Sequence, residues 1–133
     1  MSRTYLVSRA ALVALLSLGA CDSRVSTEPS YQPQVVNLPN DFAYQASSLV
    51  DVTDERVYTW QSDGTAASVS QIPSGLTGTA SLFVYDGAGS QVYQHALTDT
   101  GTFTTAAGAA GVWSVRVHFE DANGALSFRL KKP

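Results

Sequence analysis

The sequence has little of what most enzyme sites are built from. It contains one cysteine and two histidines, and only 14% of its 133 residues are charged. A single cysteine excludes an intrachain disulfide. No Gly-x-Ser-x-Gly, His-Glu-x-x-His or Cys–His arrangement occurs, so hydrolase and zinc-protease signatures are missing. We therefore expect a protein without catalytic residues and without a cofactor.

Long apolar runs are also scarce, and the main one lies near the N-terminus. Residues 10–18 read AALVALLSL, about nine residues, which is well short of the ~20 that a membrane-spanning helix needs. Arg3 and Arg9 precede the run, and the small residues Gly19 and Ala20 follow it. This order is typical of a secretory signal peptide, so residues 1–20 are predicted to form a helical signal that is removed.

The signal ends in Leu18-Gly19-Ala20-Cys21, which resembles the lipobox of bacterial lipoproteins. The resemblance implies that the Cys21 thiolate takes a diacylglycerol group and that its new amino group is then acylated, for example with palmitate. Two or three chains satisfy the requirement for stable anchoring, since each buried CH₂ contributes ~0.8 kcal/mol. We expect an exported, membrane-anchored lipoprotein at the periplasmic face or the cell surface. The alternative is an ordinary signal peptide followed by a chance cysteine.

The charge of the mature chain bears on its partners. Without residues 1–20, six Lys and Arg remain against eleven Asp and Glu, a formal charge of −5. Such acidity disfavours nucleic acids and anionic lipid surfaces as partners.

Residues 21–40 are predicted to be the lipidated cysteine and a flexible linker. Three of the five prolines fall here, Pro29, Pro33 and Pro39, among Ser, Thr and Gln, and no strand or helix period is sustained. The nineteen residues after Cys21 could span at most ~65 Å. Alternatively, residues 35–38 form a first edge strand.

Residues 41–133 alternate between apolar and polar positions and carry turn signals, with no amphipathic helix. The strand candidates are 42–46, 56–61, 67–72, 80–85, 91–97, 102–105, 112–119 and 126–130. Short strands separated by glycine-rich turns predict an all-β domain, a single antiparallel β-sandwich of jelly-roll type with about seven or eight strands.

The last two candidates are expected to form a hairpin around residues 121–124 (DANG). Pairing Phe119 with Leu126 would place the apolar side chains of both segments on one face. The same register would set Arg116 against Arg129, a mildly unfavourable arrangement.

The domain resembles the bacterial pre-peptidase C-terminal type of β-sandwich over roughly residues 56–130. The shared pattern is Tyr58-Thr59-Trp60, then LFVYD at 82–86 with a glycine turn, then GVWSVRV at 111–117 and the closing FRL at 128–130. The resemblance implies a non-catalytic module, of a type that in some members binds calcium or polymers. The paired acids that family members often carry are replaced here by TAS at 79–81, which argues against calcium at that place.

Two sets of residues are candidates for binding. Asp51, Asp54 and Glu55 could offer carboxylate oxygens to a calcium ion, although acids are common in any exposed loop. Tyr58 and Trp60 could form a platform for a sugar ring or, as their family positions imply, pack inside the core. Arg116, His118 and Arg129 fall on outward strand positions and could bind a ligand or be solvated surface residues.

The combined interpretation is a lipid-anchored β-sandwich of the cell envelope with a non-enzymatic binding or scaffolding role. Its expected partners are the membrane, through the lipid, and an envelope protein or a polysaccharide. The alternative function is a carbohydrate- or polymer-binding module displayed on the cell surface. Exposed coplanar aromatic rings would favour sugar binding, and a large exposed apolar patch would favour a protein partner.

Overall fold

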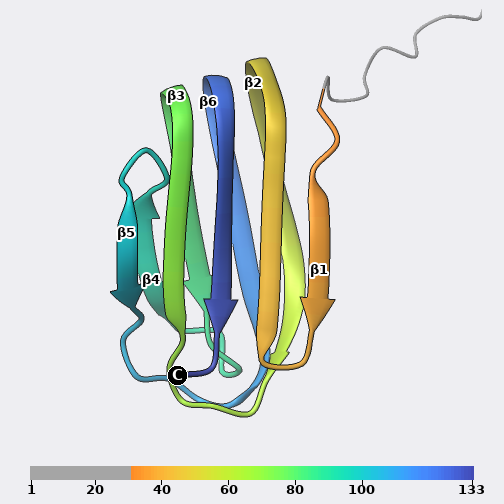
Figure 1. Cartoon of the computed structure of the whole chain (residues 1–133). Helices are drawn as coiled ribbons and strands as arrows, with labels where there is room; N and C mark the ends of the chain where they lie inside the picture. Colours follow the sequence, from red (N-terminus) through yellow and green to blue (C-terminus); the bar gives the residue numbers. More distant parts are fainter. Residues whose placement is uncertain (1–30) are drawn as a thin grey trace, which may run out of the picture.

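The computed structural model describes residues 31–133 (Figure 1), so the predicted signal peptide, Cys21 and the first part of the linker lie outside the described residues. The prediction of an all-β, antiparallel fold is confirmed. The six strands are β1 Gln34–Leu38, β2 Asp41–Ser62, β3 Ser68–Tyr85, β4 Gln91–Ala96, β5 Gly101–Thr104 and β6 Gly111–Lys131. None of these residues forms a helix long and apolar enough to cross a membrane.

Three strands are long enough to serve both layers of the sandwich. β2, β3 and β6 have 22, 18 and 21 residues and run side by side, with β6 in the middle (Figure 1). Layer A contains β1, the first half of β2, the second half of β6, the first half of β3 and β5. Layer B contains the other halves of the three long strands and β4.

The strands change layer where their period of two is interrupted. Along the first half of β2 the buried residues are Phe42, Tyr44 and Ala46, then Leu49 and Val52 at spacings of three. The register of β2 against β6 shifts at the same places, between Ala46 and Asp54. A spacing of three turns the strand by one side-chain position. Each long strand therefore keeps an apolar face toward the core in both layers.

Glycines let neighbouring bends approach closely. Gly78 and Gly124 have φ angles of +84° and +114°. A Cβ on Gly78 would collide with the carbonyl oxygen of Asp121, and one on Gly124 with the carbonyl oxygen of Gly75. Asp121 itself has a φ of +50°, a conformation that non-glycine residues seldom adopt. The bends thus lock together through backbone contacts.

The core between the layers is rich in aromatic rings. Trp60 and Trp113 meet edge to face, with ring centroids 5.8 Å apart, and Tyr44 stacks on Phe128 at 4.9 Å. All four are at most 2% exposed. Such pairs add specific geometry to the large apolar area that each ring buries. The Trp60 indole nitrogen also donates a hydrogen bond of 3.0 Å to the carbonyl oxygen of Leu38.

The turn between β3 and β4 is built around one carboxylate. The side chain of Asp86 is nearly buried and accepts hydrogen bonds from the backbone nitrogens of Ala88, Ser90 and Ala109 at 2.8–3.0 Å. These bonds, first of all that from Ala109, hold the pKa of Asp86 below its usual range. Asp86 therefore fastens the β3–β4 turn to the segment that leads into β6, and this contribution to stability is lost as pH falls through the lowered pKa.

Two parts of the chain differ from expectation. Gln34–Leu38 form strand β1, which pairs with β2. This agrees with the alternative of an edge strand at residues 35–38 and not with a flexible linker there. The predicted hairpin at 121–124 is wrong. β6 runs continuously through this segment, and Phe119 pairs with Asp54 and Ala80 rather than with Leu126.

The hairpin prediction failed because two apolar segments can face the same core either as neighbours in one layer or from opposite layers. Phe119 and Leu126 do face the same core, but from opposite layers. Arg116 and Arg129 consequently lie in different layers, and the expected like-charge contact does not occur. The segment between the strand candidates 67–72 and 80–85 is likewise a bend within β3 rather than a turn between two strands.

The bend contacts give a direct test. Gly124→Ala should lower the free energy of unfolding by about 3 kcal/mol or more, because backbone atoms that cannot move aside meet the new Cβ. Gly75→Ala is the matched control. Gly75 also has a positive φ, of +61°, but no heavy atom lies within 4 Å of a Cβ built there, so only the ~1–2 kcal/mol of a left-handed residue is expected. Equal losses in denaturant titrations of the two variants would contradict the locked-bend account.

Candidate functional site

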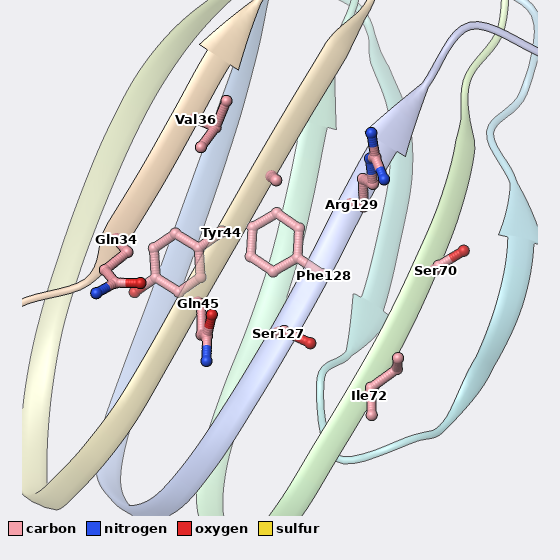
Figure 2. Close-up of a pocket in the computed structure, with 10 residues that line it drawn as sticks. Gln34, Val36, Tyr44, Gln45, Ser70, Ile72, Ser127, Phe128 and Arg129 are labelled. Carbon is pink, nitrogen blue, oxygen red and sulfur yellow. The ribbon is translucent and has the colours of Figure 1, made fainter.

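The outer face of layer A is hollowed into a groove of about 420 Å³ (Figure 2). Its walls and floor come from β1, β2, β6 and β3. The residues that line it are Gln34, Val36, Ala43, Tyr44, Gln45, Ser70, Ile72, Ser127, Phe128 and Arg129. A smaller hollow of about 190 Å³ continues toward the bends and shares Gln45, Ile72 and Ser127 with the groove.

Strand register explains why the groove exists. One row across the sheet reads Gln34, Gln45, Ser127 and Ile72, and the next reads Val36, Ala43, Arg129 and Ser70. Small side chains (Ala43, Ser70 and Ser127) lie between larger ones. Because directly opposed residues are only ~5 Å apart, short side chains leave a hollow between their longer neighbours.

The groove offers hydrogen-bonding groups that the fold does not use. Within the described residues, the side chains of Gln34, Gln45 and Ser127 make no hydrogen bond. Gln34 and Gln45 are exposed cross-strand partners. Together, two amides and a hydroxyl present both donors and acceptors in one row.

The one cation of the groove is held in place by an acid. Arg129 makes two hydrogen bonds to Asp41, from Nε to Oδ1 at 2.8 Å and from Nη2 to Oδ2 at 2.6 Å. This contact keeps the pKa of Asp41 below its usual range. The bidentate geometry fixes the guanidinium plane and offsets its charge. The groove is therefore polar but close to neutral.

Two exposed aliphatic side chains stand on either side of these polar groups. Val36 on β1 is 54% exposed and Ile72 on β3 is 62% exposed. Both point out of the sheet, away from the core. A ligand lying between them would meet apolar surface on both sides and hydrogen-bonding groups beneath it.

The residues singled out in the sequence do not meet in one place. Trp60 lies in the core, 1% exposed. Tyr58 is half-buried and packs against Phe42 and Tyr44. Neither offers a free platform on the surface. Arg129 lies in the groove, whereas Arg116 lies on the outer face of layer B.

A charged network occupies the outer face of layer B. His118 approaches Glu55 through Nδ1 at 3.0 Å and Glu120 through Nε2 at 2.9 Å. Hydrogen bonds from the imidazole to these two carboxylates, first of all to Glu120, raise the pKa of His118. Arg116 lies 3.6 Å from Glu55 and places its guanidinium 5.1 Å from the ring centre of Tyr85. The network thus sets two acids against a guanidinium and an imidazole, and Arg116 Nε is buried without a hydrogen-bond partner among the described residues.

The three acids considered for calcium diverge in the structure. Asp51 contacts Asn123 across the bend. Asp54 accepts hydrogen bonds from Tyr31 and Arg56, and Glu55 belongs to the network on layer B. Within residues 31–133 no group of three or more His, Cys, Asp and Glu side chains could hold a metal ion.

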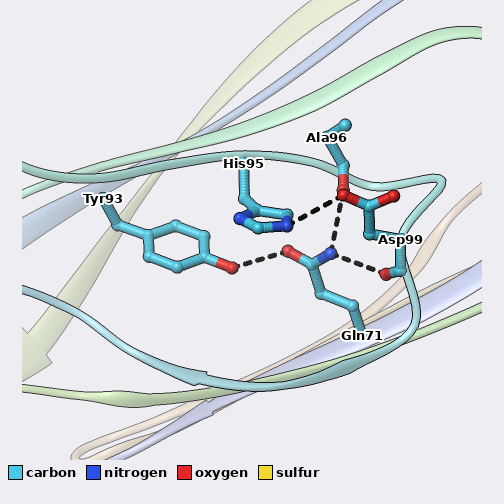
Figure 3. A network of polar contacts seen from close by, with 5 residues as sticks. All are labelled: Gln71, Tyr93, His95, Ala96 and Asp99. Atoms are coloured by element: carbon cyan, nitrogen blue, oxygen red, sulfur yellow. Dashed lines mark hydrogen bonds and ion pairs between the residues drawn. The ribbon is translucent and has the colours of Figure 1, made fainter.

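The second histidine belongs to a structural network (Figure 3). The amide of the buried Gln71 accepts a hydrogen bond from the hydroxyl of Tyr93 at 2.8 Å and donates to the carbonyl oxygens of Ala96 and Asp99. His95 contacts the Asp99 carboxylate at 3.0 Å and stacks against Phe103. Burial, assisted by Asp99, raises the pKa of Tyr93 to about 12. These bonds tie the β4–β5 connection to β3.

The comparisons with known proteins give distant structural likenesses and no family. No family model matches the chain, and no curated protein matches it. Among solved structures, one titled "CBM4 structure and function" aligns with a TM-score of 0.39 and 9% identity, over 76% of this chain and 78% of that chain. The ligand must therefore be argued from the groove itself.

The network on layer B predicts a pH dependence. The His118 imidazole should titrate above its ordinary value of 6.5 in an NMR titration of its ring protons, and Glu120→Gln should lower its pKa toward that value. Because the folded-state pKa is raised, the stabilisation is complete below pH ~6.5 and is lost as pH rises through the raised pKa. An unchanged His118 pKa in Glu120→Gln would contradict the proposed bridge.

Proposed function

We propose that this chain is a lipid-anchored, non-enzymatic binding protein of the bacterial cell envelope and that the groove on layer A is its ligand-binding surface. The observation that carries the proposal is the row of unused amide and hydroxyl groups between two exposed aliphatic side chains. Concave surfaces that combine apolar walls with a few polar groups are the usual form of ligand sites.

The lining of the groove is not explained by the stability of the fold. Exposed Val36 and Ile72 bury little area, and the amides of Gln34 and Gln45 bond to nothing in the described chain. The outer face of layer B carries a charged network instead, together with the exposed side chains of Val57 and Val112. Layer A is proposed as the binding face because its unused polar groups line a groove.

The groove favours an uncharged, hydroxyl-rich ligand. Its donors and acceptors are neutral, and its one guanidinium is already paired with Asp41. It is open to solvent along its length and continues into the smaller hollow, so a segment of a polymer would fit better than an enclosed small molecule. A neutral polysaccharide of the envelope is accordingly the leading candidate ligand.

Hydrogen bonding, rather than ring stacking, would provide the recognition. Tyr44 and Phe128 form the floor of the groove but are at most 2% exposed. Without an exposed aromatic platform, each sugar residue would bind weakly, and affinity would come from several residues bound along the groove.

The lipid anchor would hold this groove close to the membrane. The described fold begins at Tyr31, so residues 22–30 alone separate it from Cys21. Nine residues can span at most ~30 Å, about half of what the sequence alone suggested. A groove within that distance would reach polymers near the membrane surface.

A side chain placed in the groove should block binding. Ser127→Arg introduces a long side chain into the central row, and Ser114→Arg is the matched control on the outer face of the same strand in layer B. Binding to soluble neutral polysaccharides is measured by affinity electrophoresis and calorimetry. We expect Ser127→Arg to weaken binding at least tenfold, a loss of about 1.4 kcal/mol, and Ser114→Arg to bind as the unmodified protein does. Equal effects of the two variants would rule out the groove.

The anchor is tested separately. Cys21→Ser removes the only thiol that can accept diacylglycerol. We expect the variant to lose lipid labelling and to move from the membrane fraction to the aqueous phase of a detergent partition. Lys132→Ser, a change far from the signal, is the control for loss of one surface side chain. Membrane retention of Cys21→Ser equal to that of the control would contradict lipidation.

A further inference from the structure

The first described segment lies at the edge of the sheet, beside one neighbouring strand. We call residues 31–38 the N-terminal strap. Its backbone pairs only with β2. Among its nonpolar side chains, Tyr31 is buried, at 3% exposed, and Val35 is partly buried against the core, whereas Val36 and Leu38 are more than half exposed. The strap is held by its backbone ladder with β2 and by hydrogen bonds from Asn37 to the Thr59 carbonyl oxygen and from Trp60 to the Leu38 carbonyl oxygen. Tyr31 adds its fully buried side chain at the start of the strap.

Tyr31 occupies a fitted socket. Its hydroxyl donates a hydrogen bond of 2.8 Å to Asp54, the guanidinium of Arg56 lies 5.1 Å from its ring centre, and its ring meets Phe119 edge to face at 5.7 Å. Burial and the Asp54 carboxylate raise the pKa of Tyr31 to about 12. The phenol therefore stays protonated, and the hydrogen bond persists, throughout the physiological pH range.

The same socket contains an opposing feature. The hydroxyl groups of Tyr44 and Tyr58 are buried, and neither makes a hydrogen bond of good geometry within the described chain, although the Tyr44 hydroxyl lies close to that of Tyr31. Burial, with the nearby phenols of Tyr31 and Tyr58, raises the pKa of Tyr44. A buried hydroxyl without a partner carries a free-energy cost that water would remove. Undocking of Tyr31 would let water reach these hydroxyl groups and remove this cost. The contacts of Tyr31 therefore stabilise the docked strap, and the buried hydroxyl groups destabilise it.

The strap also forms one wall of the groove. Gln34 and Val36 belong to both (Figure 2), and Tyr44 lines the groove while its buried side chain lies beside Tyr31. If the strap detached from β2, the groove would lose that wall and two of its binding groups. Groove and strap are therefore linked through Gln34, Val36 and Tyr44.

We propose that the strap is a releasable element that assembles the groove when docked and dismantles it when undocked. The role in binding rests on the proposed function of the groove.

Hydrogen exchange of the mature protein in detergent micelles tests the strap without any ligand. Tyr31→Phe keeps the ring but loses the bond to Asp54, so exchange of the β1 amides should accelerate about tenfold. Tyr44→Phe removes an unpaired hydroxyl, so β1 exchange should slow. Tyr93→Phe, whose lost hydroxyl serves Gln71 at the other side of the molecule, should leave β1 unchanged.

Two results would overturn the release of the strap. Either unchanged β1 exchange in Tyr31→Phe, or equal acceleration in β1 and in the central strand β6, would show that the strap does not open by itself. Faster β1 exchange in Tyr44→Phe would show that its hydroxyl stabilises docking, which also contradicts the account.

A ligand arm separates the strap from the proposed function. A neutral polysaccharide that binds the docked form should slow β1 exchange by about the factor 1 + [L]/Kd. If calorimetry shows binding but β1 exchange does not change, the coupling is wrong and the groove assignment stands. If no polysaccharide binds, the proposed function fails while the exchange of the variants still decides whether the strap opens.

Discussion

The passage of three strands from one layer to the other is the constraint on which the rest of the structure depends. β2, β3 and β6 each bend once, and the bends pack so tightly that Gly78 and Gly124 have no room for a Cβ. With the bends locked, the register is set in both layers at once. The register in turn decides which side chains share a row on each outer face, and the groove is a result of those rows.

The two outer faces then follow different chemistry. On layer B, Glu55, His118 and Arg116 form a charged network. On layer A, small side chains alternate with amides, and the only cation is bound to its own acid. Burying a paired charge costs less than burying an isolated one, so a neutral ligand can cover this face at modest cost. In the proposed release of the strap, this face would also lose one wall of its groove.

Much of the fold could be predicted from the sequence, and the site could not. Alternation marked nearly every strand segment, and the inward phase of Trp113, Val115 and Val117 placed them in the core. The sequence analysis did not predict that β6 is one continuous strand, because a bend within a strand and a hairpin turn contain the same residue types. The spacing of three between the buried residues Phe119 and Ala122 was the pattern that could have indicated a bend. The groove depends on pairing between strands far apart in the chain, as in Gln45 with Ser127, and no local pattern reports that. Cys21 lies outside the described residues, so the lipid anchor is a prediction from the sequence of the lipobox.

The central claim is that the envelope ligand lies against layer A, and site-specific photo-crosslinking in intact cells tests it most directly. A photoreactive residue replaces Gln45 in the groove or, as the matched position on the outer face of layer B, Gln94. The account predicts ligand-dependent crosslinks from position 45 and none from position 94. Crosslinks from position 94 alone would contradict it.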